Sequence, residues 1–172
     1  MSAQDSKLFV ISGPSGAGKG TLVTRVRERR SNLGLTVSAT TRAPRKGEVD
    51  GVNYFFLTRE EFDRRVANGE FVEWAEVHGN CYGTLVSEVT SKLASGSSLI
   101  LEIDVQGALQ VKERFPEAVL IFIKPPSLEV LRERLVGRGT ETPETIELRM
   151  ANAADELALA DRYDDVVVND DL

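Results

Sequence analysis

The sequence contains little cysteine, no long apolar run and no apolar segment at its start. Cys81 is the single cysteine among 172 residues, so no disulfide can form within the chain, which fits a reducing compartment. No apolar run approaches the roughly 20 residues of a membrane-spanning helix. The polar segment Met1–Lys7 lacks the apolar core of a signal peptide. We therefore expect a cytoplasmic protein with no membrane partner.

Positive charge is also in deficit. The chain has 27 acidic against 21 basic residues, a net charge of −6. An acidic chain without a basic stripe is not expected to bind nucleic acid. Any anionic ligand must be held by a local cluster of basic side chains. The composition indicates no particular oligomeric state.

Short, continuous apolar runs predict the strands. They do not alternate with polar residues, which is typical of parallel strands covered on both faces. The runs are Leu8–Ile11, Leu99–Leu101, Val119–Ile123 and Val166–Val168. A chain of about 150 residues buries roughly 70% of its unfolded surface, so this length suits a single domain with one substantial core.

Helical stretches separate these runs. They cover Thr21–Arg30, Gly107–Phe115, Ser127–Val136 and a longer segment that starts at Pro143. Ser127 suits the N-cap of its helix, and Thr142 suits the N-cap before a proline in the first helical position. This alternation of strand and helix predicts an α/β sandwich.

The middle of the chain does not follow this alternation of strand and helix. Half-buried strands are predicted at Tyr54–Phe56 and Phe71–Val77, and Thr58 opens a short helix with a capping-box pattern. We expect a small α+β lobe over about 38–90 and a short lid over about 137–142. The core would then comprise about 1–37, 91–136 and 143–172. An α/β fold normally carries a covering helix after its last strand, so we expect a C-terminal helix to be missing.

The strongest motif follows the first predicted strand and opens the first predicted helix. It reads Gly13, Pro14, Ser15, Gly16, Ala17, Gly18, Lys19, Gly20 and Thr21. Glycines let the backbone point N–H groups at phosphates, and the helix N-terminus adds partial positive charge. Lys19 supplies a point charge for the β- and γ-phosphates. The hydroxyl expected directly after the lysine comes one residue later, at Thr21, so Mg²⁺ would be held mainly by phosphates and water.

A second phosphate site is indicated by Arg42 and Arg45, which can form a fork around a proline. Further motifs follow at Gly51–Phe56, Glu70–Trp74, Gly79–Thr84, Leu101–Gly107, Gly137–Glu141 and Val168–Leu172. In this order and spacing, from about residue 7 to 172, the chain resembles guanylate kinase of the P-loop nucleoside monophosphate kinases. The resemblance implies a P-loop NTPase-type parallel sheet with flanking helices, an inserted GMP-binding lobe and a lid.

The resemblance also implies an activity and a set of site residues. The activity is ATP- and Mg²⁺-dependent phosphorylation of GMP and dGMP in purine nucleotide metabolism. The implied ATP site comprises Gly13, Pro14, Ser15, Gly16, Ala17, Gly18, Lys19, Gly20, Thr21, Arg138 and Asn169. The implied GMP site comprises Ser38, Arg42, Arg45, Tyr54, Glu73, Tyr82, Thr84 and Asp104. The implied catalytic cations are Lys19, Arg42, Arg138 and Arg149, and Thr21 would face the metal largely through water.

The chemistry of guanine agrees with this assignment. Guanine presents N1–H and its 2-amino group as neighbouring donors, and one carboxylate, Glu73, can accept from both. Hydroxyls such as Ser38 and Thr84 can donate to O6. A site built to hydrogen-bond one group rejects an analogue without it by about 10⁴-fold. The acids Glu102 and Asp104 follow a buried strand, where the family places acids near the metal and the acceptor; which acid serves which role is left open.

Two other classes of function compete with this hypothesis. A guanylate-kinase-like module that binds peptides would be expected to lack the intact phosphate loop that this sequence keeps. A kinase with another acceptor would not need Glu73 together with Ser38. Taken singly, Glu73 would be a solvent-facing acid, and Arg42 and Arg45 would be surface charges; only the joint pattern favours a site.

Overall fold

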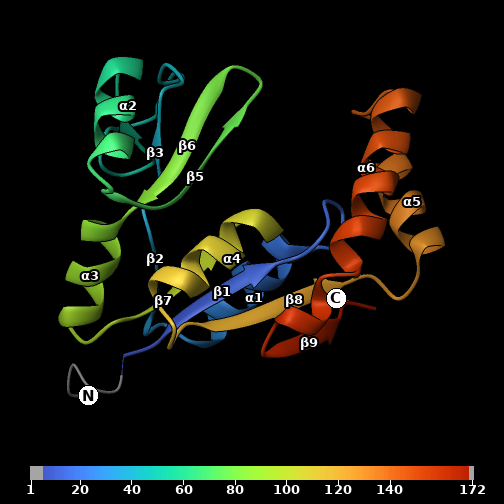
Figure 1. The fold of residues 1–172 in the computed structure, drawn as a ribbon. Helices are drawn as coiled ribbons and strands as arrows, with labels where there is room; N and C mark the ends of the chain where they lie inside the picture. Colours follow the sequence, from blue (N-terminus) through green and yellow to red (C-terminus); the bar gives the residue numbers. More distant parts are fainter. Residues whose placement is uncertain (1–5, 171–172) are drawn as a thin grey trace.

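The structure, a computed structural model, describes residues 6–170. Its elements are β1 (Leu8–Ser12), α1 (Lys19–Arg29), β2 (Leu33–Leu35), β3 (Ala39–Thr40), β4 (Phe55–Phe56), α2 (Arg59–Ala67), β5 (Phe71–Val77), β6 (Asn80–Leu85), α3 (Val86–Ala94), β7 (Ser98–Glu102), α4 (Val105–Arg114), β8 (Val119–Lys124), α5 (Leu128–Gly137), α6 (Pro143–Leu157), η2 (Ala160–Arg162) and β9 (Asp165–Val168) (Figure 1). They form a five-stranded sheet in the order β2-β7-β1-β8-β9 and a four-stranded sheet in the order β4-β3-β6-β5.

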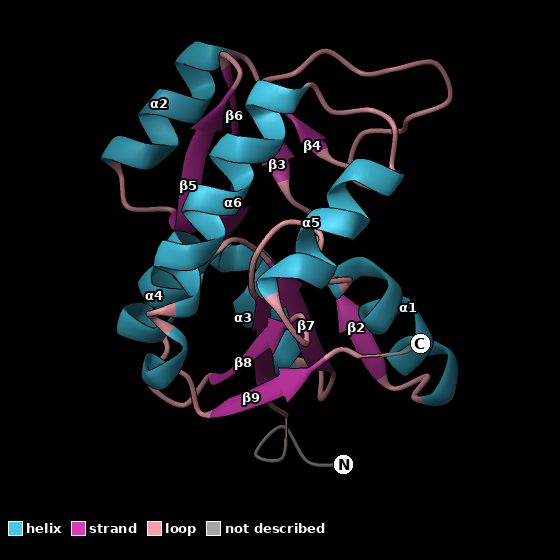
Figure 2. Cartoon of the chain, turned by 90° about the vertical axis from the view of Figure 1, so that its right-hand side faces the viewer, coloured by secondary structure: helices cyan, strands magenta, loops and turns pink. Residues whose placement is uncertain are grey.

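The five-stranded sheet is parallel throughout and carries the main core. Successive residues of a strand point to opposite faces, so Val10 packs into the core on the α3 and α4 side, whereas Ile11 packs on the α1 side. Figure 2 shows α4 and α1 on opposite sides of this sheet. Burial on both faces explains why β1, β7 and β8 read as unbroken apolar runs. The predicted α/β fold with a parallel sheet is confirmed.

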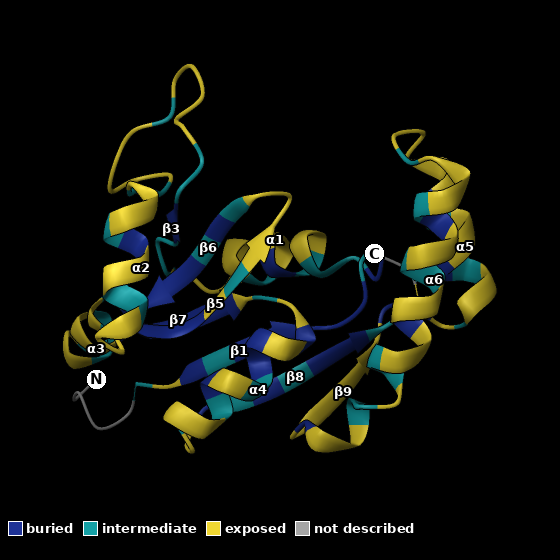
Figure 3. Cartoon of the chain, turned by 45° about the horizontal axis from the view of Figure 1, so that its top comes forward, coloured by how far each residue is buried: buried dark blue, intermediate teal, exposed yellow. Residues whose placement is uncertain are grey.

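The last strand differs from the others. Val166, Val167 and Val168 of β9 are 45%, 38% and 50% exposed, and β9 is drawn as exposed in Figure 3. The prediction that this run is covered on both faces is therefore wrong: β9 is an edge strand with one neighbour, β8. An apolar groove of about 530 Å³ runs beside it, lined in part by Phe9 and Leu22. The prediction that a C-terminal helix is missing concerns positions outside the described residues and stays a prediction.

The four-stranded sheet belongs to the inserted segment and has a core of its own. Phe62 of α2 stacks on Phe71 of β5 with ring centroids 4.4 Å apart, and Cys81 is buried beside them. The predicted N-cap of α2 is confirmed, because the Thr58 side chain accepts a hydrogen bond from the Glu61 N–H at 3.1 Å. The inserted segment therefore has its own sheet and its own hydrophobic core, separate from those of the main sheet.

Helices α5 and α6 pack against each other around Leu131, Leu135 and Ile146. Both predicted caps are confirmed: Ser127 accepts from the first turn of α5, and Thr142 accepts from the first turn of α6. In Figure 1 the small sheet and the α5–α6 pair rise from the main sheet as two projections on the same side. Among residues 6–170, no helix is long and apolar enough to cross a membrane.

Candidate nucleotide site

The phosphate loop connects β1 to α1. Gly13 has φ 141°, and a Cβ at this position would lie 2.1 Å from the Ile123 carbonyl oxygen. Only glycine fits such a close approach of two backbones. Gly18 precedes α1 in the left-handed conformation, at φ 88°. The loop therefore ends on the first N–H groups of a helix, which form a binding site for anions.

Lys19 is the cation of this loop. Its ammonium group donates to the Gly13 carbonyl at 2.6 Å and to the Pro14 carbonyl at 3.1 Å. Burial lowers the pKa of Lys19, and the nearby carboxylates of Glu102 and Glu156 oppose that shift. The loop carbonyls thus hold the charge in the cradle where phosphates are expected.

Two of the predicted ATP-side residues contact the loop directly. The Arg149 guanidinium donates to the Ser15 hydroxyl and forms an ion pair with Glu141 at 3.0 Å. The Asn169 side chain is buried, and its amide nitrogen donates to the Ala17 carbonyl at 2.8 Å. Residues 134 positions or more apart in sequence are thereby joined to one loop.

The other ATP-side residues are less constrained. Arg138 is the C-cap residue of α5 and is exposed, and Thr21 lies exposed on α1. Glu102 lies against the start of α1, since a Cβ added to Gly20 would be 3.5 Å from its carboxylate oxygen. Among the described residues, no three His, Cys, Asp or Glu side chains gather to hold a metal.

The predicted base-recognition residue, Glu73, is buried in the small sheet. It lies on β5 opposite Thr84 of β6, next to an irregularity in the strand register. Its side chain is 8% exposed, and the Thr84 hydroxyl donates to its carboxylate at 2.8 Å. Burial raises the pKa of Glu73 to about 7, and the charge of Asp104 adds to this rise. In this geometry Thr84 orients the carboxylate.

Arg42 and two tyrosines form the predicted acceptor-phosphate cluster. The guanidinium carbon of Arg42 lies 5.3 Å from the centre of the Tyr54 ring, and the Tyr54 and Tyr82 rings are 6.2 Å apart. Glu48 binds the Arg42 guanidinium through both carboxylate oxygens, at 2.9 and 3.0 Å, and accepts the Arg45 N–H at 2.7 Å. One carboxylate thus bridges the Arg42 guanidinium and the Arg45 backbone N–H, while the Arg45 side chain is exposed.

The acids Glu102 and Asp104, whose roles the sequence leaves open, face different parts of the site. Glu102 lies at the start of α1, and its charge acts on Lys19. Asp104 caps α4 by accepting the Gly107 N–H at 2.7 Å, and its charge acts on Glu73. Glu102 therefore lies on the phosphate-loop side, whereas Asp104 lies between the loop and the small sheet, since its charge acts on both Lys19 and Glu73.

Sequence reasoning missed the residues that hold the predicted cations. Glu48 pairs with Arg42, Glu141 pairs with Arg149, and Glu156 acts on Lys19. Glu48 and Glu141 stand inside segments that the sequence singled out, but an acid in a polar loop carries no distinctive signal. Only the fold shows which acidic side chain lies next to which basic side chain.

The parallel sheet and its glycine-rich loop at a helix N-terminus define a P-loop nucleotide-binding α/β protein. The sequence model of the guanylate kinase family matches residues 5–172, so the chain belongs to the guanylate kinase family.

Individual relatives agree with this assignment. A guanylate kinase of Gloeobacter violaceus is 59% identical over 97% of this chain and 82% of its own length. One of Halalkalibacterium halodurans is 54% identical over 100% of this chain and 84% of its own length. The crystal structure of guanylate kinase from Anaplasma phagocytophilum matches with a TM-score of 0.68 and 39% identity, over 96% of this chain and 78% of that one.

Proposed function

We propose that the chain transfers the γ-phosphoryl group of ATP to GMP or dGMP, and so produces GDP or dGDP. The observation that carries the proposal is the buried carboxylate of Glu73 in a fold that also holds an intact phosphate loop. A triphosphate cradle alone indicates a nucleotide, whereas a buried base-facing acid indicates which acceptor is used. Membership of the guanylate kinase family supports both a nucleoside triphosphate donor and a GMP acceptor.

Glu73 matches the base of GMP. An ionised carboxylate only accepts hydrogen bonds, and guanine offers N1–H and its 2-amino group side by side. Adenine has an acceptor at N1 and no 2-amino group, so it would offer the buried Glu73 neither of the two donors that guanine provides. Such a mismatch costs about 10⁴-fold in specificity in sites of this kind.

The phosphates of the two nucleotides require the cations. We assign the GMP phosphate to Arg42, Arg45, Tyr54 and Tyr82, and the transferring phosphoryl group to Lys19, Arg138 and Arg149. Phosphoryl transfer needs alignment and positive charge more than covalent chemistry from the protein. The GMP phosphate is already an anionic nucleophile, so no general base is required.

The residues near the loop fit a magnesium ion that arrives with ATP. Mg²⁺ prefers oxygen ligands, keeps several waters and takes few protein carboxylates. Thr21 and Glu102 offer such oxygens on the α1 side of the loop, where they would meet the ion through water. When bound, Mg²⁺ neutralises charge on the β- and γ-phosphates.

Productive transfer also requires that water be excluded from the phosphates. The small lobe, about 38–90, and the lid, about 137–142, carry the acceptor residues and Arg138, respectively. We infer that both close over the nucleotides, as lids do in many transferases. Arg138 is exposed at the end of α5, and its charge already acts on Lys19 in the phosphate loop.

A coupled assay of ADP release tests this function. ATP and Mg²⁺ are supplied with GMP, dGMP, AMP, CMP or UMP in separate reactions. Turnover with GMP and dGMP only is the expected result. Equal turnover with AMP would contradict the role of Glu73. No turnover with any acceptor, while GMP binding persists by calorimetry, would instead indicate a binding module.

A further inference from the structure

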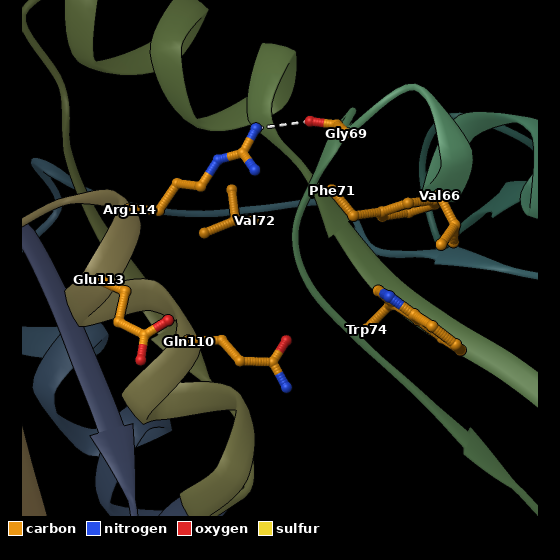
Figure 4. Close-up of a pocket in the computed structure, with 8 residues that line it drawn as sticks. All are labelled: Val66, Gly69, Phe71, Val72, Trp74, Gln110, Glu113 and Arg114. Atoms are coloured by element: carbon orange, nitrogen blue, oxygen red, sulfur yellow. Dashed lines mark hydrogen bonds between the residues drawn. The ribbon is translucent and has the colours of Figure 1, made fainter.

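Helix α4 of the main domain runs along β5, the strand that carries Glu73. At its C-terminal end, Arg114 donates a hydrogen bond to the Gly69 carbonyl, just before β5 (Figure 4). Figure 4 also shows Gln110 and Glu113 of α4 across a pocket from Trp74. At its N-terminal end, Gly107 faces Glu73 itself. The helix is therefore the part of the main domain against which the guanine-recognition strand rests.

Gly107 has no side chain at the point of closest approach. A Cβ there would lie 3.1 Å from Glu73 Oε2 and 3.0 Å from Asp104 Oδ1. Both values are shorter than ordinary van der Waals contact, so an added methyl group would displace one of the carboxylates by a few tenths of an ångström. A glycine within a helix costs about 0.5–1 kcal/mol relative to alanine. Helix formation therefore gives no reason for glycine here, whereas the two carboxylates do.

Each carboxylate is held by a hydrogen bond. Glu73 is 8% exposed, and its other oxygen, Oε1, is held by Thr84 at 2.8 Å. Asp104 Oδ1 is held by the Gly107 N–H at 2.7 Å, which is the N-cap bond of α4. A methyl group at residue 107 would thus press on Glu73 from one side while Thr84 holds it from the other.

We propose that Gly107 is a positioning residue for guanine specificity, because its missing side chain leaves room for the Glu73 carboxylate of β5 beside the Asp104 carboxylate that caps α4. Gly107 acts through these two acids. The proposal deepens the proposed function, since it concerns how the same site holds the acceptor base.

Gly107→Ala tests this assignment. A displacement of about 1 Å can cost about 100-fold in rate, so a shift of a few tenths should raise the KM for GMP about tenfold. The KM for ATP should stay within twofold, and the melting temperature should hold or rise because alanine favours the helix. Gln110→Ala, an exposed change on the same helix, is the matched control and should leave both KM values unchanged.

A second measurement removes the dependence on folding. The ratio of kcat/KM for GMP to kcat/KM for IMP, which lacks the 2-amino group, does not depend on how much enzyme is folded. Gly107→Ala should lower this ratio several-fold. An unchanged ratio overturns the proposal, whether or not the melting temperature falls.

A double-variant cycle tests whether Gly107 acts through Glu73. In a Glu73→Ala background, Gly107→Ala should change the KM for GMP by less than twofold, because the side chain it displaces is already gone. A persistent tenfold effect would overturn the action through Glu73. If the unaltered chain does not phosphorylate GMP at all, the proposed function fails first, and the GMP-to-IMP ratio of binding constants from calorimetry then tests Gly107 on its own.

Discussion

The two nucleotide sites of this chain are built in different ways. The phosphate loop is nine consecutive residues, and we expect its backbone N–H groups and Lys19 to bind the phosphates. The proposed guanine pocket takes Glu73 from β5, Thr84 from β6 and Asp104 from the start of α4. The first site is local in sequence, whereas the second exists only when two sheets pack together.

The difference has consequences for what each site can tolerate. Backbone donors do not change with most substitutions, so the loop depends on its glycines and on one cation. The guanine pocket depends on a buried acid whose charge is costly to bury and whose position is set by neighbours. We therefore expect variants of the loop to lose rate, and variants of the pocket to lose specificity and to alter pH dependence.

The largest effect is expected from Lys19→Ala. Removing the cation from the transferring phosphates should lower kcat by about 10³-fold or more. The melting curve should stay within a few degrees, because Lys19 bonds only to loop carbonyls. Arg25→Ala, an exposed cation on the same helix, should have normal kinetics. A collapsed melting curve for Lys19→Ala would show that the loss is structural.

Glu73→Gln should produce the sharpest separation between the two sites. An amide offers one acceptor and one donor where guanine needs two acceptors, so kcat/KM for GMP should fall about 10²- to 10³-fold. The KM for ATP should stay within twofold, as measured at saturating GMP. Glu76→Gln, an exposed acid on the same strand, is the control. Unchanged GMP kinetics in Glu73→Gln would remove this residue from the base pocket.

The pH dependence of activity should follow Glu73. Burial raises its pKa to about 7, and only the ionised form accepts both guanine donors. kcat/KM for GMP should therefore rise up to about tenfold per pH unit below pH 7 and level off above it. Glu73→Gln should lose this dependence. A flat wild-type profile between pH 5.5 and 7 would contradict the assignment.

The same ionisation should affect stability with the opposite sign. The folded pKa lies above the ordinary 4.5, so the folded state binds this proton more tightly than the unfolded state. The free energy of unfolding should then fall by about 3 kcal/mol as pH rises from about 4.5 through 7. Urea unfolding at pH 5 and pH 8 measures this loss, which Glu73→Gln should lack.

The smallest effect is expected from Thr84→Val, which removes the hydroxyl that orients Glu73. A hydrogen bond to a charged group contributes about 1.5–3 kcal/mol, and part of this loss is recovered when guanine binds. We expect kcat/KM for GMP to fall several-fold and the midpoint of its pH profile to move upward. Thr90→Val on α3, whose hydroxyl bonds only to helix carbonyls, should change neither.

Local patterns in the sequence predicted much of the framework. The runs that became β1, β7 and β8 are continuous because both faces are buried. A strand buried on both faces has apolar residues at successive positions, and this pattern is visible in the sequence. Thr58, Ser127 and Thr142 were predicted as caps, because a cap bonds to an N–H three residues away. The phosphate loop was predicted for the same reason: its function depends on consecutive residues.

The sequence analysis mispredicted the burial of β9 and missed Glu48 and Gly107, because in each case the outcome depends on neighbours that are distant in sequence or unspecified by it. Val166–Val168 reads like a buried strand, yet β9 lies at the edge of the sheet, and an apolar run does not specify its neighbours. Glu48 matters because it pairs with Arg42, and Gly107 matters because it lies beside Glu73.

By itself, the sequence determined β1, β5, β7 and β8, the helix caps, the phosphate loop and the family resemblance, since each rests on residues close together or on their order along the chain. Only the tertiary structure decided that Thr84 donates to Glu73, that Glu102 lies against the start of α1, that Asp104 caps α4, and that Gly107 lies beside the Glu73 and Asp104 carboxylates. Such contacts depend on distances between elements that lie far apart in sequence, and no local pattern encodes those distances.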